Sequence, residues 1–132
     1  MKRNQEIVVS NKLIKNLKEK GFQIQKYYAR TTRSIYLKLD YGVCCGIRIS
    51  DHNGKKKYKY KFNLIKQYNG PKIIIDRGYT RLFYNYNNTN ELIKDVQNEK
   101  KAKINKYGLY NYQKYMKINS KDNLYRSFKN VA

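Results

Sequence analysis

The sequence predicts an α+β fold with an N-terminal helix, an antiparallel sheet of about five to six strands, and C-terminal helices. Apolar residues recur at helical spacing near the start of the chain and again after residue 88. Between these segments they alternate with polar residues at period two, and Gly-containing turns separate the alternating stretches, as in antiparallel hairpins. The 132 residues contain no repeat or low-complexity linker, so we expect one domain over residues 1–132.

The first helix is predicted over Asn11–Lys20. Ser10 is expected to be its N-cap, and the apolar segment Ile7–Val9 is expected to lie before it. Gly21 is expected to end the helix as a C′ glycine. The residues expected to face inward are Leu13, Ile14 and Leu17. A strand is predicted next, over Phe22–Tyr28.

Three strands joined by two turns are predicted within the stretch Ser34–Leu64. In the first strand, Ser34–Leu39, Ile and Leu residues alternate with Ser, Tyr and Lys, so one set lies on each face. The tract Asp-Tyr-Gly is a turn signal and leads to the second strand, Val43–Ser50, with Arg48 on its polar face. An Asn-Gly dipeptide then favours a hairpin, and the third strand is Lys57–Phe62.

The third predicted strand has one aromatic face and one lysine face. Tyr58 and Tyr60 alternate with Lys57, Lys59 and Lys61, and the preceding turn adds a further cationic pair, Lys55 and Lys56. Such a strand packs its rings inward and presents a row of cations outward, which suits a polyanion. Solvated lysines that block edge-to-edge aggregation produce the same pattern, so both interpretations stay open.

Arginines mark two further segments. Arg30 and Arg33 flank two threonines, and guanidinium and hydroxyl groups both donate to phosphate oxygens, so this bend is a candidate phosphate contact or simply a polar turn. After a loop at residues 67–71, strands over residues 72–76 and 80–86 are predicted to form a hairpin. The hairpin places Arg77 and Arg81 among tyrosines that can stack bases or fill the sheet.

Two C-terminal helices are predicted, with Gly108 between them. Asn88 and Glu91 have the spacing of a capping box at the start of the first. The second is predicted over Leu109–Ile118. The polar and basic residues 119–132 are expected to form a loosely docked tail.

The charge of the chain is extreme, since 30 basic and 9 acidic residues give a formal net charge of +21 and a pI of about 10.0. This balance points to nucleic acid, a ribonucleoprotein or an acidic protein surface as the partner. The excess of Lys and Asn also follows from AT-rich coding DNA, which accounts for part of the charge. It does not account for the scarcity of Asp.

The sequence offers little catalytic chemistry. Cys44 and Cys45 are adjacent, and neighbours in a strand point to opposite faces, so we expect no disulfide between them and burial of one of the two. No His/Cys cluster has metal-ligand spacing, and we predict no metal or cofactor. His52 is the single histidine and lies in a predicted turn. No signal peptide or membrane-spanning run is visible, so we expect a non-membrane protein in the cytoplasm of a bacterial host.

Residues Ser10–Gly54, with the segment NKLIKNLKEKGFQIQKYY, resemble HicA-type toxins, whose fold looks like a double-stranded RNA-binding domain. The order of helix, Gly-Phe and three strands carries the resemblance, which implies affinity for RNA. The catalytic histidine of that family falls in a strand segment that corresponds to Thr32–Tyr36 here, where no histidine is present. The resemblance therefore does not carry ribonuclease activity to this chain.

The segments Ser34–Tyr36 and Ile47–His52 resemble short strands of small phage and mobile-element proteins, among which anti-CRISPR proteins are the most similar group. This resemblance implies a non-enzymatic, phage-type inhibitor that binds a host nucleoprotein, such as a CRISPR effector, at its guide RNA or an acidic protein surface. A free DNA- or RNA-binding protein is the second hypothesis. A ribonuclease toxin that uses His52 is the third. The predicted contact residues are Arg30, Arg33, Arg48, Lys55, Lys56, Lys57, Tyr58, Lys59, Tyr60, Lys61, Arg77 and Arg81.

Overall fold

The computed structural model describes residues 2–29, 34–49, 62–65, 81–84, 86–121 and 128–131. Short 3-10 turns at residues 40–42 and 86–88 join the regular elements. In chain order, these elements are α1 (Lys2–Glu19), β1 (Ile24–Tyr28), β2 (Ile35–Leu39), β3 (Cys45–Ile49), β4 (Phe62–Ile65), β5 (Arg81–Tyr84), α2 (Thr89–Tyr107), α3 (Leu109–Lys121) and β6 (Lys129–Asn130).

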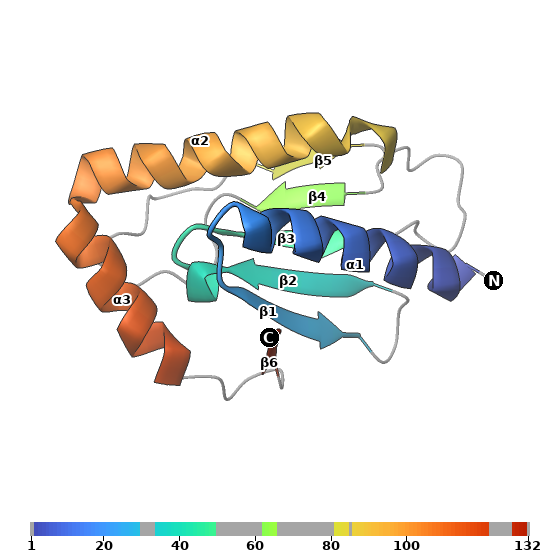
Figure 1. Cartoon of the computed structure of the whole chain (residues 1–132), viewed down its shortest axis with the longest axis horizontal. Coiled ribbons are helices and arrows are strands. Elements are labelled where there is room, and N and C mark those ends of the chain that lie inside the picture. Colours follow the sequence, from blue (N-terminus) through green and yellow to red (C-terminus); the bar gives the residue numbers. More distant parts are fainter. Residues whose placement is uncertain are drawn as a thin grey trace.

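In the described residues, the strands form one antiparallel sheet in the order β5-β4-β3-β2-β1-β6. Helices α1 and α2 lie over the same face of this sheet, and α3 lies at one end, beside the turn between β2 and β3 (Figure 1). The expected α+β class, with an N-terminal helix, an antiparallel sheet and two C-terminal helices, is confirmed.

The core lies between the sheet and helices α1 and α2. On β2, the alternating residues Ile35, Leu37 and Leu39 are each at most 1% exposed, as the period-two pattern predicts. The facing residues on β3 are Ile47 and Ile49, which are equally buried. The helices supply Leu13, Ile14, Leu17, Leu92, Ile93 and Val96 to this core.

Helix α1 begins at Lys2, well before the expected N-cap, so the N-cap prediction for Ser10 is wrong. The apolar stripe explains the longer helix, because Ile7, Ile14 and Leu17 recur on the same side of α1 as Ser10. Ser10 is fully buried within this stripe, and its hydroxyl has no hydrogen-bond partner among the described residues.

Glycines end α1 and α2 as predicted. Gly21 has φ +89°, its N–H donates to the Lys18 carbonyl at 3.0 Å, and the Phe22 N–H donates to the Leu17 carbonyl at 3.1 Å. These two bonds form a Schellman motif. Gly108, with φ +91°, separates α2 from α3.

The predicted capping box at the start of α2 is not formed. The side chain of Asn88 makes no capping hydrogen bond. Instead, the Thr89 hydroxyl donates to the Tyr86 carbonyl at 2.7 Å, which fixes the 3-10 turn before the helix.

Part of the predicted tail is attached to the sheet. Residues 119–121 belong to α3, and Lys129–Asn130 pairs with β1 as the edge strand β6. The side chain of Phe128 is 2% exposed, and the Val131 N–H donates to the Ile24 carbonyl at 2.9 Å. Residues 128–131 are therefore not loosely docked.

Several sequence predictions fall outside the described residues. They include most of the strand predicted over residues 57–62, the strand over residues 72–76, and the turns and loops at residues 51–54, 67–71 and 77–78. Phe62, expected to end a strand, instead begins β4. The strand predicted over residues 80–86 is shorter, at Arg81–Tyr84.

Candidate nucleic-acid interface

Of the predicted contact residues, Arg48 is the one whose side chain is described. Arg81 is placed in β5, where its backbone pairs with Ile65 of β4. The remaining predicted contacts lie outside the described residues: Arg30, Arg33, Lys55, Lys56, Lys57, Tyr58, Lys59, Tyr60, Lys61 and Arg77.

Arg48 is held in a defined orientation on the sheet. It lies between the buried residues Ile47 and Ile49, so alternation directs its side chain to the face opposite α1 and α2. Its Nε donates to the hydroxyl of Ser34 at 2.9 Å, and its guanidinium carbon lies 5.7 Å from the ring centroid of Tyr36. The guanidinium is therefore positioned beside an aromatic ring and is partly exposed.

Aromatic rings continue from Arg48 across the neighbouring strands. Tyr36 is the register partner of both Arg48 on β3 and Tyr27 on β1. The centroids of the two tyrosine rings are 6.2 Å apart, and the ring of Phe128 lies 5.4 Å from that of Tyr27. We call these four residues, Phe128, Tyr27, Tyr36 and Arg48, the sheet row.

Residues just before and within β6 make contacts at the Phe128 end of the sheet row. The ammonium of Lys38 lies 4.3 Å from the centroid of the Phe128 ring, and Lys38 is only 7% exposed. Next to it, the Gln25 amide donates to the side-chain oxygen of Asn130 at 3.2 Å. Lys38, which the sequence places on the polar face of β2, is thus largely covered rather than solvated.

Most of the exposed charges among the side chains whose burial is described lie on the helices. The exposed acidic side chains in this set are Glu19 and Glu91, whereas Asp40 is fully buried and Asp95 and Glu99 are partly buried. The exposed lysines are far more numerous: Lys12, Lys15, Lys20, Lys94, Lys101, Lys106, Lys114, Lys117, Lys121 and Lys129.

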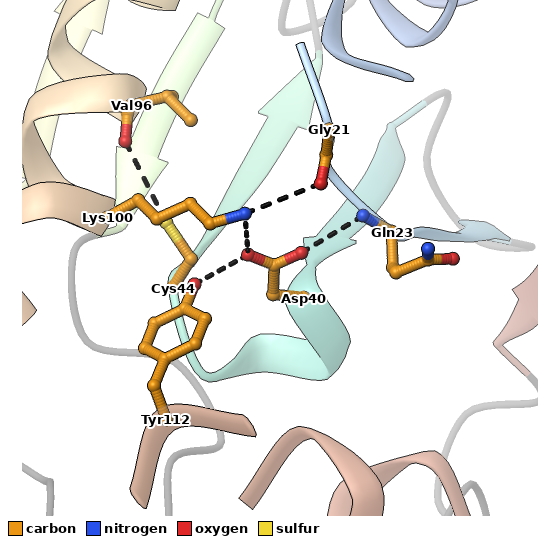
Figure 2. Close-up of polar contacts among 7 residues, drawn as sticks. All are labelled: Gly21, Gln23, Asp40, Cys44, Val96, Lys100 and Tyr112. Atoms are coloured by element: carbon orange, nitrogen blue, oxygen red, sulfur yellow. Dashed lines mark hydrogen bonds and ion pairs between the residues drawn. The ribbon is translucent and has the colours of Figure 1, made fainter. Parts of the chain in front are cut away.

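One carboxylate joins the elements at the α3 end of the sheet (Figure 2). Asp40 accepts hydrogen bonds from the Tyr112 hydroxyl at 2.6 Å and the Gln23 backbone N–H at 3.0 Å, and its other contact is an ion pair with Lys100 at 3.1 Å. We call these four residues the Asp40 cluster. It connects the turn after β2 to α2, to α3 and to the segment that follows α1.

The turn that carries Asp40 has unusual backbone angles. Asp40, Tyr41 and Gly42 have φ values of +52°, +57° and +86°, and only the last is a glycine. Asp tolerates this region better than most residues, whereas Tyr does not. The sequence predicted the turn but gave no sign that its aspartate is buried and bonded to residues distant in the chain.

Burial keeps Tyr112 neutral. Desolvation, together with the neighbouring Cys44 and Asp40, raises the pKa of Tyr112 far above its ordinary value, so the hydroxyl stays a hydrogen-bond donor. Lys103 is also buried, at 6% exposure, and its ammonium donates to the carbonyls of Val43 and Cys44. Lys103 also forms an ion pair with Glu99 at 3.6 Å.

Both cysteines are buried free thiols, so the expectation that one of them is exposed or only partly covered is wrong. The Cys44 thiol contacts the Val96 carbonyl at 3.8 Å, and burial raises the pKa of Cys45. Tyr84, one of the hairpin tyrosines for which base stacking and filling of the sheet were both left open, is also buried, and its hydroxyl donates to Asp95. These groups stabilise the fold and do not line an accessible site.

A pocket of about 290 Å³ lies beside the Asp40 cluster. Its lining combines Lys100 and Tyr112 of the cluster with apolar side chains of α2 and α3, among them Ile104, Leu109 and Met116. In the described residues, no group of three or more His, Cys, Asp or Glu side chains is placed to hold a metal ion. The polar residues that line the pocket are Lys100, Tyr112, Gln23 and Gln113.

The comparisons with known proteins give no match, either to a protein-family model, to a curated protein or to a solved structure. Among the described helices, none has the length and apolar character that a bilayer crossing requires.

Proposed function

We propose that this protein binds the phosphate backbone of nucleic acid, either as a free strand or within a nucleoprotein. The supporting observation is the excess of exposed positive charge: the net charge is +21, and in the described residues lysines are exposed along all three helices with few exposed carboxylates beside them. A cationic surface of this kind attracts a polyanion over long distances and releases the counterions of the phosphates on binding.

The chemistry of the exposed cations favours backbone contact over base reading. An ammonium is a compact point charge on a flexible stem, whereas bidentate recognition of a base edge is typical of arginine. Lysine-dominated helices therefore predict binding with little sequence preference and a strong dependence on salt. Each phosphate contact contributes a slope of roughly 0.7 to 0.9 log units per decade of salt.

The phage-type inhibitor of a host nucleoprotein is one form of this proposal, and the free nucleic-acid binder is the other. A tagged pull-down from bacterial lysate, with and without nuclease, distinguishes them. One defined nucleoprotein that survives nuclease and moderate salt supports the inhibitor. Bulk RNA or DNA that disappears with nuclease supports the free binder.

The ribonuclease hypothesis predicts that His52→Ala abolishes RNA cleavage, and no observation in the described residues favours it.

Fluorescence anisotropy with labelled 20-nucleotide RNA and DNA tests the proposal directly. We expect binding at 50 mM NaCl that weakens steeply as salt rises. The combined variant K12E/K15E/K94E/K101E reverses four exposed lysines on α1 and α2. It should weaken binding at least tenfold and flatten the salt slope, because its phosphate contacts are lost.

The matched control is K12R/K15R/K94R/K101R, which keeps the charge at the same four positions and should bind within about threefold of the native chain. The proposal would be contradicted if the glutamate variant bound nucleic acid as tightly as the native chain. It would also be contradicted if the affinity of the native protein did not depend on salt. Circular dichroism of both variants confirms that the fold is retained.

A further inference from the structure

We propose that the sheet row, Phe128, Tyr27, Tyr36 and Arg48, is a platform on which the bases of single-stranded nucleic acid stack. This inference rests on the proposed nucleic-acid binding and specifies the strand form that is bound. It assigns a role to the face opposite α1 and α2, whereas the backbone contacts proposed above lie on the helices.

The row has the arrangement that stacking requires. Tyr27 and Tyr36 are register partners on adjacent strands, with ring centroids 6.2 Å apart, and both residues are partly exposed. Sheets that bind RNA present aromatic rings on neighbouring strands in this way, each ring stacking one base. Because every base has an aromatic face, stacking adds affinity without reading sequence.

Arg48 adds a cation at the end of the row. The bond from its Nε to Ser34 and its position beside the Tyr36 ring hold the guanidinium at the surface of the sheet. A guanidinium in this place can accept a stacked base on its plane or donate to a phosphate next to the base on Tyr36.

Exposure distinguishes the two tyrosines from core residues. Phe128, at 2% exposure, is enclosed between Tyr27 and the Lys38 ammonium and therefore anchors the row. Tyr27 and Tyr36 are partly exposed residues, so we assign the base contact to them rather than to Phe128. In a duplex the base faces are already stacked on one another, so the row favours single strands.

The test compares three probes of equal length at one salt concentration: an oligouridine, an abasic strand with the same backbone, and an RNA duplex. We expect the native protein to bind oligouridine at least tenfold more tightly than the abasic strand, because base stacking on aromatic rings is worth about a tenfold factor or more per base. Tyr36→Leu and Tyr27→Leu should each remove most of this preference without altering the affinity for the abasic strand.

Two controls separate stacking from folding. Tyr36→Phe keeps the ring and should retain the preference for bases. Tyr28→Leu makes the same change on the opposite face of β1, where the residue is 39% exposed, and should leave the preference unchanged. Thermal unfolding of each variant shows whether the fold survives.

Photo-crosslinking tests the platform in the native protein, without any substitution. A strand containing 5-iodouracil should crosslink to Tyr27 or Tyr36 in peptide mapping. Crosslinks confined to the helices, or equal affinity for the oligouridine and abasic strands, would overturn the stacking platform while leaving salt-dependent backbone binding intact. Absence of binding to all three probes would instead refute both proposals.

Discussion

At the scale of single residues, Asp40 is the group on which most long-range contacts converge. A fully buried carboxylate is costly unless it is paired and hydrogen-bonded. Here the cost is offset by one N–H, one hydroxyl and one ammonium, which come from three different parts of the chain (Figure 2). The cluster therefore fixes where α3 lies relative to the sheet and is a determinant of fold rather than of binding.

We expect Asp40→Asn to destabilise the protein by about 2 to 4 kcal/mol. The amide has nearly the shape of the carboxylate and Asn also tolerates positive φ, so the loss reflects the missing charge and the changed hydrogen bonds. Urea denaturation measures the effect. Lys100→Met is the companion variant, and combining the two isolates their coupling energy. A loss below about 0.5 kcal/mol in Asp40→Asn would show that the cluster contributes little.

At the scale of elements, β6 shows how a strand of two residues can be held at the edge of a sheet. Its backbone pairing is brief, but Phe128 fills the space between Tyr27 and Lys38, and the Lys18 ammonium donates to the Val131 carbonyl at 2.9 Å. The strand is therefore attached mainly by one ring and a few polar contacts, which makes its attachment testable by a single substitution.

Phe128→Ala should lower the free energy of unfolding by about 3 to 4 kcal/mol, the usual range for removing a buried ring. Hydrogen exchange at the Val131 amide should accelerate in the variant, because that N–H bonds to Ile24 only while β6 is docked. Lys129→Ala, at an exposed neighbouring position, is the control and should be nearly neutral. Equal stability of the two variants would mean that residues 128–131 are held weakly after all.

The sequence predicted correctly those features of the fold that depend on residues adjacent in the chain. The alternation in β2 and β3 placed Ile35 and Leu37 on one face of β2 and Ile47 on one face of β3, and these are the faces that the core covers; Gly21 and Gly108 marked two helix ends correctly. These predictions succeed because side-chain period and positive φ depend on adjacent residues.

Predictions failed where burial depends on partners far along the chain. Ser10 has the local features of an N-cap, but an apolar stripe on both sides of it extends the helix through this position. Lys38 and Cys44 are buried by Phe128 and Val96, whose positions no local pattern indicates. The sheet row was missed for the same reason: Arg48 and Tyr36 could be placed on a polar face, but their alignment with Tyr27 requires the strand register.

At the scale of the whole molecule, a net charge of +21 on 132 residues makes the protein repel itself in the absence of a polyanion. Salt screens this repulsion, with a Debye length of roughly 14 Å at 50 mM and about 4 Å at 500 mM, from the scaling of screening with ionic strength. Stability should therefore rise with NaCl over the range in which nucleic-acid binding falls. Chloride is preferred to sulfate for the test, because sulfate also strengthens apolar burial.

We expect the melting temperature of the native chain to increase by about 3–5 °C between 50 and 500 mM NaCl, which corresponds to about 1 kcal/mol for a domain of this size. The variant K12E/K15E/K94E/K101E lowers the formal charge by 8, from +21 to +13, and its increase should be smaller. Differential scanning fluorimetry gives both values. A melting temperature that falls with NaCl in the native chain would mean that attractive ion pairs in the folded state outweigh the repulsion among its lysines, and it would contradict this prediction.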